Sequence, residues 1–205
     1  MTDELFDAFI QTFGRGKTRQ QVPESALSRY RGVLPDRLLE IWREEGWSSY
    51  GDGLVWIVDP QAYEGIVDMW LRNTPVAGID KYHVIARTAF GDLFLWGEVT
   101  GPTITLSCPL HMLVFLPGRV EKRVENPDRA LRIFFATLSR AGCDRDNLFK
   151  RALKRLGPLG PEEMYGFEPA LIVGGEISID HLVKVDLNVH LSILRQLGAP
   201  RVGGF

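Results

Sequence analysis

The first hydrophobic pattern in the chain is helical. Residues 3–13 carry apolar side chains three or four positions apart and are followed by a glycine, which predicts an amphipathic helix. The polar residues 14–32 predict a surface connection. A second helix is predicted to begin after Leu34-Pro35 and to end at Gly46 as its C-cap.

The stretch from Gly46 to Pro60, GWSSYGDGLVWIVDP, changes character halfway. Residues 46–53 combine aromatic side chains with Ser, Gly and Asp, and we expect them to form a loop. The apolar run Leu54–Val58 predicts a buried strand. Asp59-Pro60 then supplies the N-cap and first residue of a helix that extends to Leu71.

Beyond Asn73 the hydrophobic period changes from helical to extended. Four short runs rich in Val, Ile, Phe, Leu and Thr are separated by Gly-Asp, Gly-Pro and Cys-Pro, which predicts an antiparallel meander. The runs are Tyr82–Ala89, Leu93–Val99, Thr103–Ser107 and Met112–Leu116.

The last third of the chain returns to helical patterns. Helices are predicted from Asn126-Pro127 to Ala141 and from Asp144 to Leu156, and one or two closing helices are predicted after Ser178. The order of helices, sheet and helices predicts an α+β fold with a central antiparallel sheet, N-terminal helices and a helical C-terminal domain. We expect the two domains to comprise residues 1–120 and 121–205.

Composition places the chain among ordinary globular proteins, because 45% of its 205 residues are hydrophobic and 24% are charged. No apolar run approaches the ~20 residues that cross a bilayer, and the acidic N-terminus differs from a signal peptide. These features predict a cytoplasmic protein without a membrane partner. The two cysteines, Cys108 and Cys143, are expected to be reduced and mostly buried.

Charge is unevenly distributed although the net charge is only -2. Residues 36–68 contain eight acidic residues and two arginines. Such a segment repels nucleic acid and attracts a basic partner, so we expect no direct contact with nucleic acid there.

No motif for catalysis or metal binding stands out. Gly14–Thr18 superficially resembles a phosphate loop, but Gln11 stands where the motif requires glycine, so a plain loop is expected. The four histidines and two cysteines lack the spacing of a metal site, and no nucleophile motif is present. We therefore predict a protein that is not an enzyme and has no cofactor. The sequence also leaves open a hydrolase whose catalytic residues come together only in the folded structure.

Trp47 and Tyr50 are the aromatic residues that helix and strand patterns do not explain. In a loop they would either fold back onto the core or contact a partner, and the neighbouring acids favour a partner. The predicted partner-binding residues are Trp47, Ser48, Ser49, Tyr50, Asp52, Glu44 and Glu45.

Two further clusters have both a structural and a functional interpretation. Glu162, Glu163 and Tyr165 form a secondary partner-binding candidate, although a turn packed between helices explains them equally well. The basic residues on the helix after Asp144 are more typical of a solvated face, and they are also the basis of an alternative function, a nucleic-acid-binding or regulatory module. These basic residues are Lys150, Arg151, Lys154 and Arg155.

Long stretches of the chain resemble a known family. LPDRLLEIWREEGWSSYGDGLVWIVDPQAYEGIVDMWL and RTAFGDLFLWGEV resemble the GAD-like domain. The segment from LFKRALKRLG to LSILRQLG resembles the C-terminal domain that accompanies GAD-like domains in immunity proteins against type VI secretion DNase effectors. The resemblance covers most of the chain beyond about residue 30, in the expected order.

This resemblance implies a cytoplasmic antidote that binds a cognate DNase toxin, has no cofactor and is not an enzyme. It does not identify the toxin. A monomer or a 1:1 complex with the toxin is expected. Joined with the acidic segment, it suggests that Trp47 and Tyr50 anchor a loop in the basic DNA-binding cleft of the toxin, with Ser48 and Ser49 as hydrogen-bonding contacts.

Overall fold

One large sheet forms the centre of the molecule. The computed structural model describes residues 4–115 and 118–203, and within them eight strands pair in the order β1-β2-β3-β4-β5-β6-β7-β10. Neighbouring strands are antiparallel except β10, which pairs in parallel with β7. The strands are β1 (Lys17–Gln20), β2 (Trp47–Tyr50), β3 (Val55–Ile57), β4 (Tyr82–Thr88), β5 (Asp92–Gly97), β6 (Gly101–Ser107), β7 (Met112–Phe115) and β10 (Arg201–Gly203).

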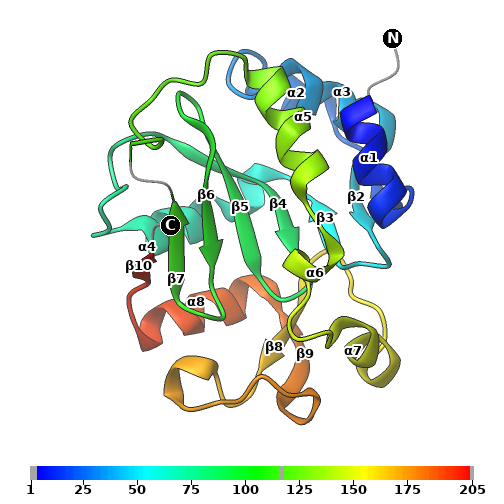
Figure 1. Cartoon of the computed structure of the whole chain (residues 1–205), viewed down its shortest axis with the longest axis vertical. Helices are drawn as coiled ribbons and strands as arrows, with labels where there is room; N and C mark the ends of the chain where they lie inside the picture. Colours follow the sequence, from blue (N-terminus) through cyan, green and yellow to red (C-terminus); the bar gives the residue numbers. More distant parts are fainter. Residues whose placement is uncertain (1–3, 116–117, 204–205) are drawn as a thin grey trace.

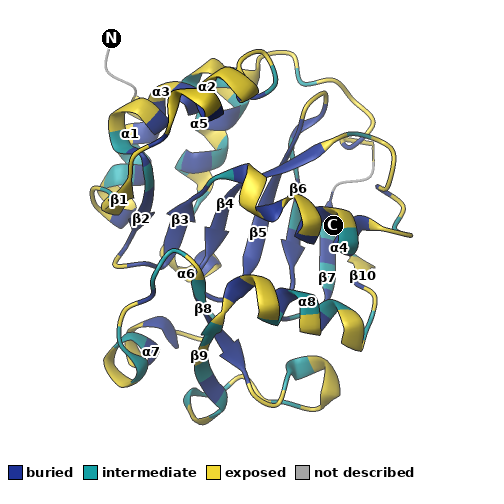
Figure 2. Cartoon of the chain, turned by 180° about the vertical axis from the view of Figure 1, so that it is seen from behind, coloured by how far each residue is buried: buried dark blue, intermediate teal, exposed yellow. Residues whose placement is uncertain are grey.

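Helices cover both faces of this sheet (Figures 1 and 2). On one face, α1 (Glu4–Phe13) packs against α5 (Pro127–Thr137), and α5 lies over β6. On the other face, α4 (Glu64–Leu71) contacts β4. Two more helices, α2 (Glu24–Tyr30) and α3 (Asp36–Glu45), lie near the upper end of α5 in Figure 1.

The C-terminal segment adds a smaller layer at the lower end of the sheet (Figure 1). Its own two-stranded sheet joins the main sheet where the Tyr165 N–H donates to the Ala89 carbonyl at 2.9 Å. The hydrophobic core therefore runs without a break from the N-terminal helices to α8, while the division at residue 120 stays a prediction. The elements of this layer are α6 (Arg140–Cys143), α7 (Phe149–Leu156), β8 (Glu163–Phe167), η2 (Leu171–Val173), η3 (Ile179–His181), β9 (Leu182–Asp186) and α8 (Leu187–Leu197).

The α+β class, the N-terminal helices and the central meander are confirmed. The predicted caps also form: Asp59 Oδ1 accepts the Gln61 N–H at the start of η1 (Pro60–Tyr63), and Asn126 Oδ1 accepts the Arg129 N–H. Gly46 ends α3 with a φ of 70°, which glycine adopts readily. One residue of the predicted fourth run, Leu116, lies outside the described residues.

Several expected connections are regular structure instead. The predicted surface connection 14–32 contains β1, which pairs with β2, and α2. Val22, Leu27 and Tyr30 in this segment are buried despite their polar neighbours. The helix expected to reach Ala141 ends at Thr137.

The closing segment is also less helical than predicted. A strand, β9, precedes the single closing helix α8, and it contains two residues that had been assigned to helices. These two residues, Leu182 and Val185, pair instead with Phe167 and Met164 of β8.

A buried polar cluster ties the C-terminal segment to the sheet. Asp92 at the start of β5 accepts hydrogen bonds from the Thr88 hydroxyl at 2.9 Å and from the Ser107 hydroxyl at 2.5 Å. The Arg145 guanidinium forms an ion pair with the same carboxylate and donates to the Ser107 oxygen at 2.7 Å. Because a buried carboxylate is costly without a partner, this pair fixes the segment between α6 and α7.

Replacing Arg145 with leucine should therefore lower the free energy of unfolding by about 3 kcal/mol, because Asp92 is left charged and unpaired. Adding Asp92→Asn to Arg145→Leu should restore part of that loss, since the unpaired charge is removed. Urea denaturation of the wild type, the single variants and the double variant measures both effects. A single variant Arg145→Leu within about 0.5 kcal/mol of the wild type would contradict this role.

Candidate functional site

The predicted aromatic loop is a strand inside the sheet. Residues Trp47–Tyr50 form β2, which pairs with β1 on one side and β3 on the other. Ser48 and Ser49 are almost fully buried. The Ser48 hydroxyl donates to the Glu45 carbonyl, and the Ser49 hydroxyl donates to the Lys17 carbonyl at 3.2 Å. Both hydroxyls are thus used inside the protein, so the expectation of a loop was wrong.

Tyr50 is a core residue. None of its surface is exposed, and its ring packs edge-on against Phe9 with 4.9 Å between centroids. Burial raises the pKa of its hydroxyl well above the usual value. Trp47 is half-buried and packs edge-on against Trp42 at 5.9 Å. Of the two alternatives left open by the sequence, the structure places Tyr50 on the core side.

The acidic members of the predicted site remain accessible. Asp52 is exposed in the turn after β2, where Lys17 Nζ lies 2.8 Å from its carboxylate, and this hydrogen bond lowers the pKa of Asp52. Glu44 is exposed on α3, with Arg37 Nη1 3.5 Å from it. Glu45 is half-buried. A partner can therefore reach carboxylates along this edge of the molecule, and their role in binding stays a prediction.

The secondary partner-binding candidate also contains both buried and accessible residues. Tyr165 is fully buried in β8, and burial raises its pKa to about 12. Glu163 accepts the Gly160 N–H at 2.7 Å and lies 3.5 Å from Lys184 Nζ. Glu162 is exposed. Glu163 and Tyr165 lie in β8, whereas Glu162 lies in the turn that precedes the strand.

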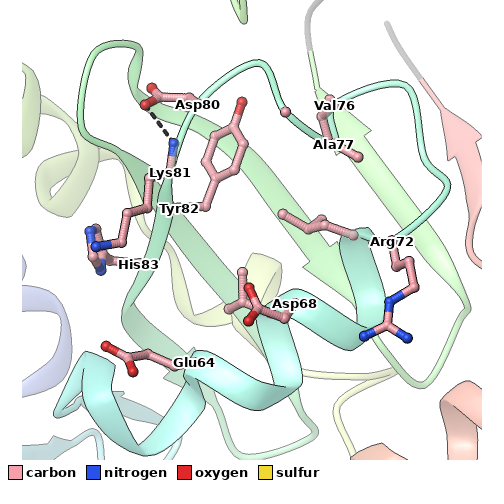
Figure 3. Close-up of a pocket in the computed structure, with 12 residues that line it drawn as sticks. Glu64, Asp68, Arg72, Val76, Ala77, Asp80, Lys81, Tyr82 and His83 are labelled. Carbon is pink, nitrogen blue, oxygen red and sulfur yellow. Dashed lines mark hydrogen bonds between the residues drawn. The ribbon is translucent and has the colours of Figure 1, made fainter.

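A hollow of about 560 Å³ lies between α4 and the segment that leads into β4 (Figure 3). Glu64 and Asp68 approach it from α4, while Asp80 and Lys81 approach it from the other side. His83 is buried at its edge, with Nε2 2.9 Å from Glu98 Oε1. Sequence reasoning missed this hollow; the only local signal was the pair of acids one helical turn apart on α4.

The hollow and its surroundings show no arrangement for metal chemistry. Among residues 4–115 and 118–203, no group of three or more His, Cys, Asp or Glu side chains is placed to hold a metal ion. The buried His111 has a structural contact, since its Nε2 lies 2.7 Å from the Leu194 carbonyl oxygen. In the same residues, no helix is long and apolar enough to cross a bilayer.

One helix face near the C-terminus is apolar and exposed. Val189, Ile193 and Leu197 follow one another at intervals of four residues on α8, opposite the buried face that carries Leu191. Exposed apolar rows of this kind are typical of protein-binding surfaces. This exposed row on α8 is therefore one accessible apolar surface of the chain.

Comparison with known proteins agrees with the order of segments along the chain. Residues 4–110 match the GAD-like domain, and residues 128–198 match the C-terminal domain of the T6SS immunity protein Tdi1. The crystal structure of Atu4351 from Agrobacterium tumefaciens has the same fold, with a TM-score of 0.84 and 23% sequence identity over 97% of this chain and 92% of that chain. No curated protein matches the chain in sequence.

The core position of Tyr50 leads to a stability prediction. Tyr50→Ala should lower the free energy of unfolding by ~3–5 kcal/mol, because it removes a large buried ring and leaves a cavity beside Phe9. Asp52→Asn, an exposed change two residues away, should stay within about 0.5 kcal/mol of the wild type. Denaturant titration of both variants tests this, and equal stabilities for the two would place the Tyr50 ring outside the core.

The cysteines should be chemically inert in the folded protein. Burial and the nearby Asp92 carboxylate raise the pKa of Cys143 to about 12 and that of Cys108 well above its usual value. At pH 8 a thiol reagent should therefore react slowly with the native protein and rapidly with two thiols after unfolding in urea. A fast-reacting thiol in the native state would contradict this prediction and would make that cysteine a candidate nucleophile.

Proposed function

The chain belongs to the GAD-like domain family, and we propose that it is an immunity protein that binds and neutralises a cognate type VI secretion DNase toxin. The observation that carries this proposal is the match of residues 128–198 to the C-terminal domain of a type VI immunity protein. In this role the chain acts by stoichiometric contact in the cytoplasm, as a monomer that forms a 1:1 complex, and needs no cofactor.

The mechanism we favour is occlusion of the DNA-binding cleft. A nuclease cleft is basic because it must hold phosphates. Glu44, Glu45 and Asp52 present carboxylates near the β1–β2 edge of the sheet, and carboxylates there would pair with the basic side chains of such a cleft.

The burial of β2 changes the role of its aromatic residues in this mechanism. Tyr50, Ser48 and Ser49 have almost no exposed surface, so they stabilise this edge of the sheet and do not contact a partner directly. Trp47 alone of the four is half-buried and retains some accessible surface. Recognition at this edge therefore rests on charge, with rigidity supplied by the packed strand beneath.

The first experiment asks whether the chain binds a nuclease at all. Sequencing first identifies a nuclease encoded by a neighbouring reading frame. This nuclease, inactivated by substitution, is mixed with the purified chain, and the affinity is measured by calorimetry. A tight 1:1 complex and loss of DNA cleavage by the active nuclease support the proposal. A neighbouring nuclease that neither binds nor is inhibited would overturn it.

The second experiment tests the acidic edge. Glu44→Lys combined with Asp52→Lys should slow association with the toxin by about tenfold at low salt, with a smaller effect at high salt, because exposed charges mainly steer the encounter. Glu121→Lys combined with Glu125→Lys, at two exposed acids in the loop before α5, makes the same change in net charge and is the control, which should leave the rate nearly unchanged. Stopped-flow kinetics measures both rates; equal slowing by the control would indicate a general charge effect.

A further inference from the structure

Helix α7 carries four basic residues within its eight positions: Lys150, Arg151, Lys154 and Arg155. Arg155 forms an ion pair with Asp180 at 2.7 Å. The other three are exposed, and among the described residues no carboxylate lies within ion-pair distance of them. The helix therefore presents three cations whose charge nothing in the described chain compensates.

This arrangement is unfavourable for the isolated helix. Lys150 and Lys154 lie one turn apart, as do Arg151 and Arg155, and like charges at this spacing destabilise a helix. Lys150 and Arg151 also lie in the first turn, which contains no acidic residue, at the end where the helix dipole disfavours cations. Local rules broken in this way are expected where function requires it.

The rest of the structure holds α7 in a fixed position. Asp144 Oδ1 accepts the Phe149 N–H at 2.9 Å at the start of the helix, and the neighbouring Arg145 is paired with Asp92. Phe149 and Ala152 are buried, and the Phe149 ring lies 6.2 Å from that of Tyr165. The three cations thus project from a rigid helix, so a partner meets them already arranged.

The size and surroundings of the helix indicate which anion it fits. A helix of eight residues is about 12 Å long, which suits a compact cluster of charges better than an extended nucleic-acid backbone. The nearby aromatic rings, Phe149 and Tyr165, are buried and offer no platform for stacking bases. Many nucleases, by contrast, hold their catalytic metal ions with carboxylates.

We propose that Lys150, Arg151 and Lys154 of α7 bind a carboxylate cluster on the cognate toxin. This inference rests on the proposed function and adds a second contact of opposite charge to the acidic edge. Both surfaces lie on the same side of the molecule, to the right in Figure 1 and to the left in Figure 2. Arg140 of α6, in the segment that leads to α7, lies beside the acidic edge, since its Nε donates to the Thr12 carbonyl at 2.9 Å and its charge acts on Asp52.

The test is a triple charge reversal, Lys150→Glu, Arg151→Glu and Lys154→Glu, in the full chain. Its affinity for the inactivated nuclease from the neighbouring reading frame should fall at least ~30-fold, because pairs become repulsions. The thermal midpoint of the free variant should equal or exceed that of the wild type, because acids suit the first turn of a helix. A neutral variant with glutamine at the three positions should show a smaller loss of affinity. It keeps the inference testable if the triple charge reversal fails to fold.

The matched control is Lys122→Glu, Arg123→Glu and Arg129→Glu, which makes the same change in net charge at exposed cations elsewhere on the chain. Lys122 and Arg123 lie between β7 and α5, and Arg129 lies in the first turn of α5. Its affinity for the nuclease should stay within about threefold of the wild type.

Native affinity in both α7 variants would overturn the inference while leaving the proposed function intact, whereas a wild-type chain that fails to bind the nuclease would overturn both. Salt-sensitive binding of a DNA duplex by the wild type alone, lost in the triple reversal, would also overturn the inference, because the occupant would then be nucleic acid.

Discussion

Two charged side chains buried in the central sheet, Arg87 and Asp92, constrain the arrangement of the rest of the chain. Arg87 is fully buried, stacks on Trp56 at 4.7 Å and donates from Nη2 to the Pro161 carbonyl at 2.8 Å. Asp92 is paired with Arg145. Both partners belong to the C-terminal segment, so the sheet cannot bury these charges favourably without it. The GAD-like part and the segment that follows it therefore depend on each other for stability, although different families match them.

The same contacts determine where the proposed binding surfaces lie. Arg145 precedes α7 by a few residues, so the ion pair that satisfies Asp92 also orients the basic helix. On the other side of the molecule, α8 is held by hydrogen bonds from Trp70 Nε1 to the Leu191 carbonyl and from Arg195 Nε to the Met69 carbonyl. The exposed faces of α7 and α8 are thus fixed by polar contacts beneath them. A surface arranged before binding loses less entropy when a partner docks, which would favour tight binding by the proposed inhibitor.

Much of this fold could be predicted from sequence, because helices α1 and α3 and the central meander have long periodic patterns and clear caps. The short strands could not. β1 is fully exposed and has no apolar pattern, so only its pairing with β2 makes it a strand. β2 has the composition of a loop, and its burial is decided by the neighbouring strands and by Phe9 of α1. For the candidate site, the charge pattern of the sequence predicted which acids are accessible. The hollow beside α4 could not be predicted, because the residues that line it come from separate segments that meet only in the folded chain.

The burial of Tyr50 has a consequence for how a partner would be selected. With that ring in the core, the proposed contact surfaces consist of carboxylates on one edge, where Asp52 and Glu44 already pair with Lys17 and Arg37, and of cations on α7. Exposed ion pairs add little affinity each, but a like charge placed opposite them is strongly unfavourable. In the proposed inhibitor, two nearby surfaces of opposite sign would reject any nuclease whose charges are not arranged in the complementary order. Discrimination by repulsion of this kind would let the proposed inhibitor separate cognate from foreign toxins without a new fold for each pair. Substitutions at a few exposed positions would change the charge pattern, while the buried charges that hold the two segments together would stay the same.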